Sequence, residues 1–150
     1  MLSFKIITKE NLEIQIENYK QLILNWEYCN WNSENFLYEL PNKWRFSFSI
    51  HNENDKLIGF CFASNKIQDV YYIHLLFLSN NLRGAGIGGE IIKNAIKIAK
   101  ENKINKIELR CPESNANALK FYQKNNFKII SVLNDETSGN EKDNYLQLVF

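Results

Sequence analysis

The chain has 150 residues, 45% of them hydrophobic and 13% aromatic, and carries a formal net charge of +1. This length and composition predict one globular domain over residues 1–150 and exclude a disordered chain. Because the charge is close to zero and the lysines are scattered, no field would recruit nucleic acid or a membrane surface, so we expect a small ligand.

The termini and cysteines place further limits on the protein. No segment approaches the ~18 apolar residues of a membrane span, and the N-terminus has no long apolar core, so we expect a cytoplasmic protein. Cys29, Cys61 and Cys111 are odd in number and show neither CxxC nor metal-like spacing. They predict free thiols rather than a disulfide framework or a zinc site, and we expect no metal.

The first 63 residues predict a strand, two helices and a hairpin from the spacing of their apolar residues. In order, these are a strand at 4–7, a helix at 12–26, a shorter helix with Ser33 as its N-cap that ends before Pro41, and hairpin strands at 46–50 and 57–63.

The apolar run from Tyr71 to Leu78 predicts a buried central strand. After a short polar bend, residues 83–89 read Arg-Gly-Ala-Gly-Ile-Gly-Gly, and from Ile87 to about Asn102 apolar residues recur at helical spacing. A glycine-rich loop therefore precedes a helix N-terminus, whose first N–H groups lack internal partners and attract anions. The glycines would let a phosphate approach the backbone, or they would only relieve strain in a tight turn.

The rest of the chain predicts a strand, a helix and two closing strands. The strand at 106–111 should run parallel to the central one, because a helix crosses over between them. Ser114 or Asn115 should cap the next helix, and the closing strands at 127–130 and 145–150 flank a polar loop. The apolar last strand predicts a sheet edge that a homodimer would cover.

Three kinds of phosphate-binding loop are compatible with glycines at this position. A nucleotide P-loop is excluded because no Lys-Ser or Lys-Thr pair follows the last glycine. Gly84, Gly86 and Gly89 match the dinucleotide fingerprint G-x-G-x-x-G, but several strands come first and the next strand ends Arg-Cys rather than in an acidic residue.

The third kind is a family resemblance carried by two motifs. Residues 83–88, Arg-Gly-Ala-Gly-Ile-Gly, resemble the Arg/Gln-x-x-Gly-x-Gly/Ala loop of the GNAT superfamily of acetyl-CoA-dependent N-acetyltransferases. Residues 115–127 resemble its second motif, Asn-x-x-Ala-x-x-Phe-Tyr followed by Gly-Phe. Asn126 stands where the family usually has glycine, and asparagine tolerates the left-handed conformation that such a turn needs.

The resemblance implies a set of residues that bind acetyl-CoA. The backbone of Phe77 and Leu78 would pair with the pantetheine arm like an extra strand, and Asn115 would contact the arm. The amides from Gly84 to Gly88 would hold the pyrophosphate, with Arg83 near it. The full set of cofactor-binding residues is Phe77, Leu78, Arg83, Gly84, Ala85, Gly86, Ile87, Gly88, Gly89, Asn115, Ala118, Phe121 and Tyr122.

The resemblance also assigns catalytic roles. Tyr122 would protonate the leaving thiolate, a role that a positioned hydroxyl can fill. The general base would be His74 on the central strand, although a strand histidine is often structural; Tyr72 and Glu108 are lesser candidates. Cys111 as an acyl-enzyme nucleophile is disfavoured, because no histidine is tied to it by motif.

These observations together predict an α/β fold with a mixed, largely antiparallel central sheet of about seven strands flanked by about four helices. The predicted function is direct acetyl transfer from acetyl-CoA to a primary amine of a small molecule or peptide, without a metal. The alternative is a non-catalytic module that binds or senses acyl-CoA. A protein N-terminus, a lysine, a polyamine, an antibiotic and an amino sugar all stay open as acceptors.

Overall fold

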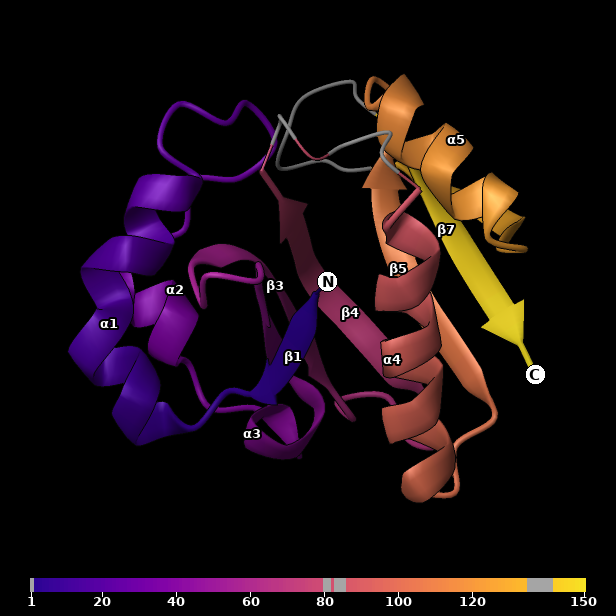
Figure 1. The fold of residues 1–150 in the computed structure, drawn as a ribbon. Helices are drawn as coiled ribbons and strands as arrows, with labels where there is room; N and C mark the ends of the chain where they lie inside the picture. The colour runs from indigo at the N-terminus through magenta and orange to yellow at the C-terminus, as the bar shows by residue number, and fades with distance from the viewer. Residues whose placement is uncertain (1, 80–81, 83–85, 135–141) are drawn as a thin grey trace.

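The computed structural model describes residues 2–79, 82, 86–134 and 142–150. In this part of the chain, five helices flank a single seven-stranded sheet with the strand order β1-β2-β3-β4-β5-β7-β6 (Figure 1). The elements are β1 (Ser3–Ile6), α1 (Lys9–Leu22), α2 (Ser33–Leu37), α3 (Lys43–Phe46), β2 (Phe48–His51), β3 (Leu57–Ser64), β4 (Tyr71–Leu78), α4 (Gly88–Glu101), β5 (Lys106–Pro112), α5 (Ala116–Lys124), β6 (Lys128–Asn134) and β7 (Lys142–Val149).

The sheet is mixed, as the sequence predicted. β4 and β5 pair in parallel, and every other neighbouring pair is antiparallel. The parallel pair follows from α4, because a crossover helix returns the chain to start β5 beside β4 in the same direction. The predicted fold class, a mixed and largely antiparallel sheet with flanking helices, is confirmed.

Helices cover the two faces of the sheet and create two hydrophobic clusters. The α4 face, which also carries α3 and α5, buries Ile91, Ile92 and Ala95 of α4 against the sheet. The α1 face, which also carries α2, buries Leu12, Tyr19 and Phe36 together with aromatic residues of β3. In Figure 1, α1 and α2 lie to the left of the central strands and α4 and α5 to the right.

A β-bulge in β4 changes which side chains face which cluster. Phe62 of β3 pairs with Leu75, while the next residue, Ala63, pairs with Ile73, so His74 is the extra residue of the bulge. Because strand residues alternate between faces, one extra residue reverses the alternation. Tyr71 and Ile73 therefore face the α4 side, whereas Leu75 and Phe77 face the α1 side.

Several predicted boundaries were wrong near the N-terminus. The first helix ends at Leu22 rather than near Trp26, and α2 ends at Leu37. The N-cap of α2 is Asn32, not Ser33, because Asn32 and Asn35 exchange side-chain-to-backbone bonds in a capping box. The alternating residues from Arg45 predicted a strand, yet residues 43–46 form the short helix α3, and β2 starts at Phe48.

The predicted edge strand was also wrong. β7 lies inside the sheet between β5 and β6, so both of its backbone edges are paired within the chain, and Leu146 and Leu148 are buried. The sheet edge on this side is β6, where Ile129, Ile130 and Val132 are exposed. A homodimer stays a prediction, and β6 rather than β7 is the strand it would cover.

Cys29, Cys61 and Cys111 are free thiols, the last two of them buried. Across the described segments, no helix combines the length and the apolar character that a membrane crossing requires.

Candidate active site

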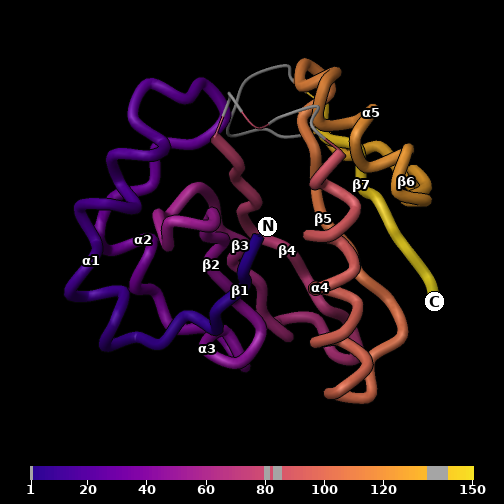
Figure 2. Tube along the Cα trace, in the orientation of Figure 1, coloured from indigo at the N-terminus to yellow at the C-terminus, as the bar shows by residue number. Residues whose placement is uncertain are grey.

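The strands β4 and β5 diverge toward their C-terminal ends. Their ladder covers residues 71–73 against 107–109, although β4 continues to Leu78 and β5 to Pro112. Figures 1 and 2 show the two strands moving apart at the end of the sheet where α4 begins. The sheet is therefore opened at the place where the sequence predicted a cofactor arm.

The N-terminus of α4 lies at this open end. Ile87 is its N-cap residue, and no side chain caps the helix. Among the described residues, the first internal bond runs from the Glu90 N–H to the Ile87 carbonyl at 3.1 Å, and none of these residues bonds the amides of Gly88 and Gly89, so they are available to a ligand. Gly86 adopts a positive φ of 78°, and a Cβ there would meet nothing within 4 Å. The predicted binding residues Arg83, Gly84 and Ala85 lie outside the described residues.

The helix α5 packs directly against this N-terminus. A Cβ on Gly88 would lie 2.2 Å from Cε1 of Phe121, so any side chain at this position would have to displace the Phe121 ring. Gly89, in contrast, has room for a Cβ, because its nearest neighbour would be Asn125 Oδ1 at 3.7 Å. The two predicted motifs are thus brought together in space through Gly88 and Phe121.

The ends of α5 explain two further motif residues. The Asn115 side chain accepts a hydrogen bond from the Ala118 N–H at 3.2 Å and is the N-cap of the helix. Asn126 has a positive φ of 73°, which confirms the left-handed turn expected where the family has glycine. Both asparagines therefore have structural roles, and Asn115 has its side-chain N–H groups left for a ligand.

Tyr122 points from α5 into the α4-side cluster and is only 8% exposed. Its ring contacts Phe121 and Phe127 edge to face, at centroid distances of 5.1 and 5.3 Å. Burial raises the pKa of Tyr122 well above its ordinary value, and the Cys111 and Cys61 thiols raise it further. Its hydroxyl is therefore protonated at neutral pH and can act as a proton donor but not as a base.

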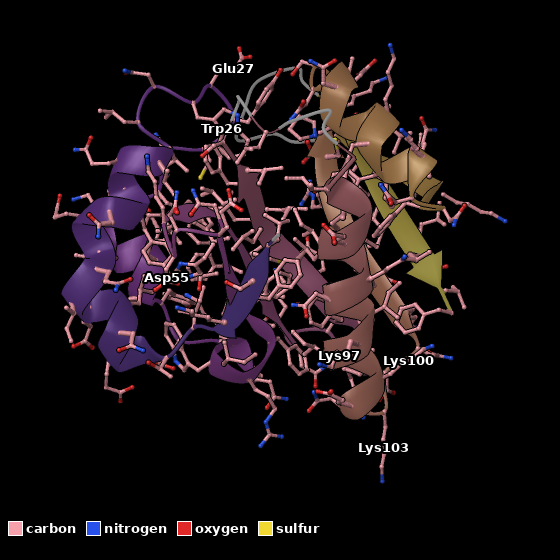
Figure 3. All side chains as sticks on the ribbon, in the orientation of Figure 1. Trp26, Glu27, Asp55, Lys97, Lys100 and Lys103 are labelled. Atoms are coloured by element: carbon pink, nitrogen blue, oxygen red, sulfur yellow. The ribbon has the colours of Figure 1, made fainter. Side chains whose placement is uncertain are left out.

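The far end of β4 is held by close backbone packing and by an aromatic contact. A Cβ on Gly59 of β3 would lie 2.4 Å from the Phe77 carbonyl oxygen, so β3 and β4 approach closely here. Trp26 packs edge to face on Phe77 with centroids 5.0 Å apart. Figure 3 shows Trp26 and Glu27 at the end of the molecule where α4 begins, so the segment after α1 borders the opened end of the sheet.

His74 lies at the bulge, beside β3 and Tyr72. Its Nε2 is 2.6 Å from the Ser64 hydroxyl oxygen, and its ring lies 4.9 Å from that of Tyr72. Burial, and after it the charges of Lys66 and Lys43, lowers the pKa of His74 to about 4. The imidazole is therefore uncharged at neutral pH. Tyr122, in contrast, lies on α5 and belongs to the cluster on the α4 face, so the predicted acid and base come from different elements.

Glu108 stands on β5 beside Tyr72 and is 7% exposed. Its carboxylate accepts hydrogen bonds from the Tyr145 hydroxyl at 2.6 Å and from the Gln147 amide at 2.7 Å. Both oxygens thus tie β5 to β7, so Glu108 is a weaker candidate for the base than His74.

Sequence reasoning missed Ser64, Lys43, Lys66 and Tyr145 as neighbours of the site. No motif contains them, and they come from four separate elements or loops. The only signal was polarity within apolar stretches: Ser64 ends the run of β3, and Tyr145 lies in a strand that otherwise alternates apolar residues.

Three lysines near the C-terminal end of α4 and just after it lie away from the site. Figure 3 shows Lys97, Lys100 and Lys103 at the opposite end of the molecule from Trp26, so they cannot reach a phosphate at the start of the helix. Within the described ranges, no group of three or more His, Cys, Asp or Glu residues is arranged to hold a metal ion.

Similar solved structures have the same fold. The ribosomal-protein-S18-alanine N-acetyltransferase from Escherichia coli superposes with a TM-score of 0.80 at 14% identity, covering 99% of this chain and 94% of that one. Ard1 from Thermoplasma volcanium gives a TM-score of 0.83 at 16% identity, covering 99% and 97%. A Bacillus anthracis str. Ames protein, solved in complex with acetyl coenzyme A, gives 0.65 at 25% identity, covering 69% of this chain and 61% of that one.

The sequence itself matches one family model. No curated protein matches the chain closely enough to be compared with it. The model of the acetyltransferase (GNAT) family, however, matches residues 15–127, which include the opened strands, the start of α4 and the whole of α5. This confirms the predicted resemblance, and the chain belongs to the GNAT family of acetyltransferases.

Proposed function

We propose that this protein transfers an acetyl group from acetyl-CoA to a primary amine by direct attack of the amine on the thioester. One observation carries the proposal. The divergence of β4 from β5 occurs at the same end of the sheet as the N-terminus of α4, and α5, which carries Tyr122, packs against that N-terminus through Phe121. The opened strands would accept an extended arm, the helix N-terminus would hold an anionic end, and Tyr122 would supply a proton.

The residues present fit acetyl-CoA. The amides from Gly86 to Gly89, with those of Gly84 and Ala85 and the side chain of Arg83, would hold the pyrophosphate at the helix N-terminus. The open space beside Gly86 suits this role, because a Cβ there would meet no atom of the described residues within 4 Å. The backbone of Phe77 and Leu78 would pair with the pantetheine arm, bordered by Asn115, Ala118 and Phe121. The cosubstrate supplies the activated acetyl group.

In the proposed reaction, the amine nitrogen bonds to the thioester carbonyl carbon and the carbon–sulfur bond breaks. His74 takes the proton that the attacking amine loses, directly or through water, since its uncharged ring has a free electron pair. Tyr122 gives its hydroxyl proton to the departing thiolate sulfur. Because burial raises the pKa of Tyr122, it stays protonated until that charge develops beside it.

An acceptor panel assayed for release of free thiol from acetyl-CoA tests the proposal. We expect at least one primary amine to accelerate thiol release well above the rate with acetyl-CoA alone, and mass spectrometry to find that amine acetylated. If acetyl-CoA binds tightly while no amine accelerates release, direct transfer is contradicted. A non-catalytic acyl-CoA-binding module would then explain the family fold better.

A further inference from the structure

A pocket of about 240 Å³ opens beside the β4 bulge, next to the predicted base. Trp31, Tyr38 and Leu40 form its apolar wall, and Asn35 of α2 adds an amide. His74 is part of the same lining, so whatever occupies the pocket also reaches the reacting end of the site. Sites for drug-sized ligands usually span ~300 Å³ or more, so this pocket suits a small molecule.

The polar part of the pocket carries charge of one sign. Lys43 and Lys66 both line it, and the described residues of the lining include no Asp or Glu. His74 of the same lining is held uncharged, and both ammonium groups contribute to the lowering of its pKa. The lining therefore carries positive charge without a carboxylate to balance it.

Lys43 is a buried cation, only 1% exposed. Its Nζ donates to the carbonyl oxygens of Phe36 at 2.6 Å and Tyr38 at 2.7 Å. Within the described part of the chain it forms no ion pair, because Glu39, which acts on it from a distance, is bonded to Lys9 at 2.9 Å and to Trp44 at 2.9 Å. A buried charge is costly unless an opposite charge is near, so an incoming anion would be favoured here.

The aromatic residues of this region do not reverse that preference. The Lys43 ammonium already lies 5.9 Å from the centroid of the Trp31 ring, and the Lys66 ammonium 5.0 Å from that of Tyr72. A second cation stacked on either ring would meet a lysine charge at close range. A polyamine or a polycationic amino sugar therefore fits this lining poorly.

We propose that the acceptor is a small amine that also carries a carboxylate, of which an amino acid with an apolar side chain is the simplest example. Its carboxylate lies against Lys66 and Lys43, its apolar part against Trp31, Tyr38 and Leu40, and its amine toward His74. This inference rests on the proposed acetyl transfer and names the acceptor class for it.

The test compares L-leucine with L-leucinamide, which differ only in the carboxylate, and adds spermidine as a polycation. Thiol release from acetyl-CoA is measured for wild type, Lys66→Gln and Lys66→Arg; Lys66 is exposed, so both variants should fold. We expect Lys66→Gln to raise KM for L-leucine about tenfold, the loss typical of one hydrogen bond to a charged group, with kcat little changed. L-leucinamide should be insensitive to the substitution, and Lys66→Arg should restore L-leucine use.

Comparing each acceptor across the variants cancels the difference in basicity between the two amines. Spermidine used better than L-leucine by wild type, or Lys66→Gln weakening L-leucine and L-leucinamide equally, would overturn the proposal. Calorimetry with N-acetyl-L-leucine and N-acetyl-L-leucinamide separates this failure from a failure of acetyl transfer. Preference for the carboxylate supports the assignment even if no amine releases thiol, and equal binding contradicts it.

Discussion

The candidate site has different chemical groups on the two sides of the opened strands. On the α4 side, the candidate site consists of backbone amides, glycines and the buried ring of Tyr122. On the α1 side, it consists of lysines, a histidine and aromatic side chains drawn from scattered elements. The first side presents main-chain groups and the second presents side chains.

This difference distinguishes the groups that would bind the cofactor from the groups that would select the acceptor. Backbone amides and a gap between strands recognise the shape and charge of the cofactor. This recognition depends little on the identity of most side chains. Side chains on the other side can change without disturbing the sheet, so they are free to set the acceptor. The fold therefore supports the cofactor assignment, whereas the acceptor has to be read from Lys43, Lys66 and His74.

The largest expected effect is on the backbone side. Gly86→Glu should weaken coenzyme A binding by at least ~10³-fold, because it places a side chain and a negative charge where the pyrophosphate would lie. Calorimetry on the folded variant measures this.

Gly86→Asn is the matched control, because asparagine tolerates the positive φ of 78° and adds no charge. It should bind far better than Gly86→Glu. Gly88 is unsuitable for the test, since any side chain there strikes Phe121. Unchanged affinity of Gly86→Glu for coenzyme A would show that the pyrophosphate does not bind at the start of α4.

The next largest effect concerns the proton donor. Tyr122→Phe removes only a hydroxyl and keeps the contacts of the ring with Phe121 and Phe127. We expect kcat to fall ~10²-fold with little change in KM for acetyl-CoA, as for loss of a positioned general acid. Steady-state kinetics with the best acceptor checks it, and full activity would reduce Tyr122 to a packing residue.

Tyr71→Phe makes the opposite prediction for a tyrosine on the same side of the sheet. The Tyr71 hydroxyl donates to the Phe46 carbonyl at 2.7 Å, and both groups are buried. Removing it leaves that carbonyl unpaired, so the free energy of unfolding should fall by ~1–3 kcal/mol while activity of the folded protein persists. Urea denaturation measures the loss. A Tyr71→Phe variant that is stable but inactive would contradict this prediction, because Tyr71 would then act in the reaction rather than in stability.

The smallest effect is a pH dependence on the side-chain side. The pKa of His74 is about 4 in the folded protein and 6.5 ordinarily, so between these values the unfolded chain binds more protons. The contribution of His74 to the free energy of unfolding is therefore fully present above pH 6.5 and is lost as the pH falls toward 4. The loss should be roughly 1–2 kcal/mol, allowing for solvent screening of a half-buried ring.

His74→Gln should flatten this part of the stability curve, because glutamine does not titrate. It also bears on the reaction: an acidic limb due to His74 would lie near pH 4, lower than an unshifted histidine would give. Denaturation curves at pH 4 and 7 for both proteins provide the comparison. An equal loss in the variant would assign the pH dependence to other groups.

The sequence predicted the backbone side well and the side-chain side poorly, for a physical reason. The glycines, the capping Asn115 and the turn at Asn126 follow local rules of backbone geometry, so a motif carries them. His74 was found only because it lies on the central strand. Its bulge, its neighbours Ser64 and Lys66 and the burial of Lys43 depend on packing between distant segments. The predicted strand at 46–50 started two residues too early, because the four residues of α3 before it are too few to reveal a helical period.

Hydrogen exchange at the start of α4 tests the central claim most directly. The amides of Gly88 and Gly89 precede the first internal bond of the helix, so in the free protein they should exchange quickly. The account predicts that acetyl-CoA alone slows exchange in residues 86–91 and 76–78, and leaves the pocket segment 31–43 unchanged. Protection of residues 31–43 without any at the start of α4 would contradict it, since the cofactor would then occupy the side that we assign to the acceptor.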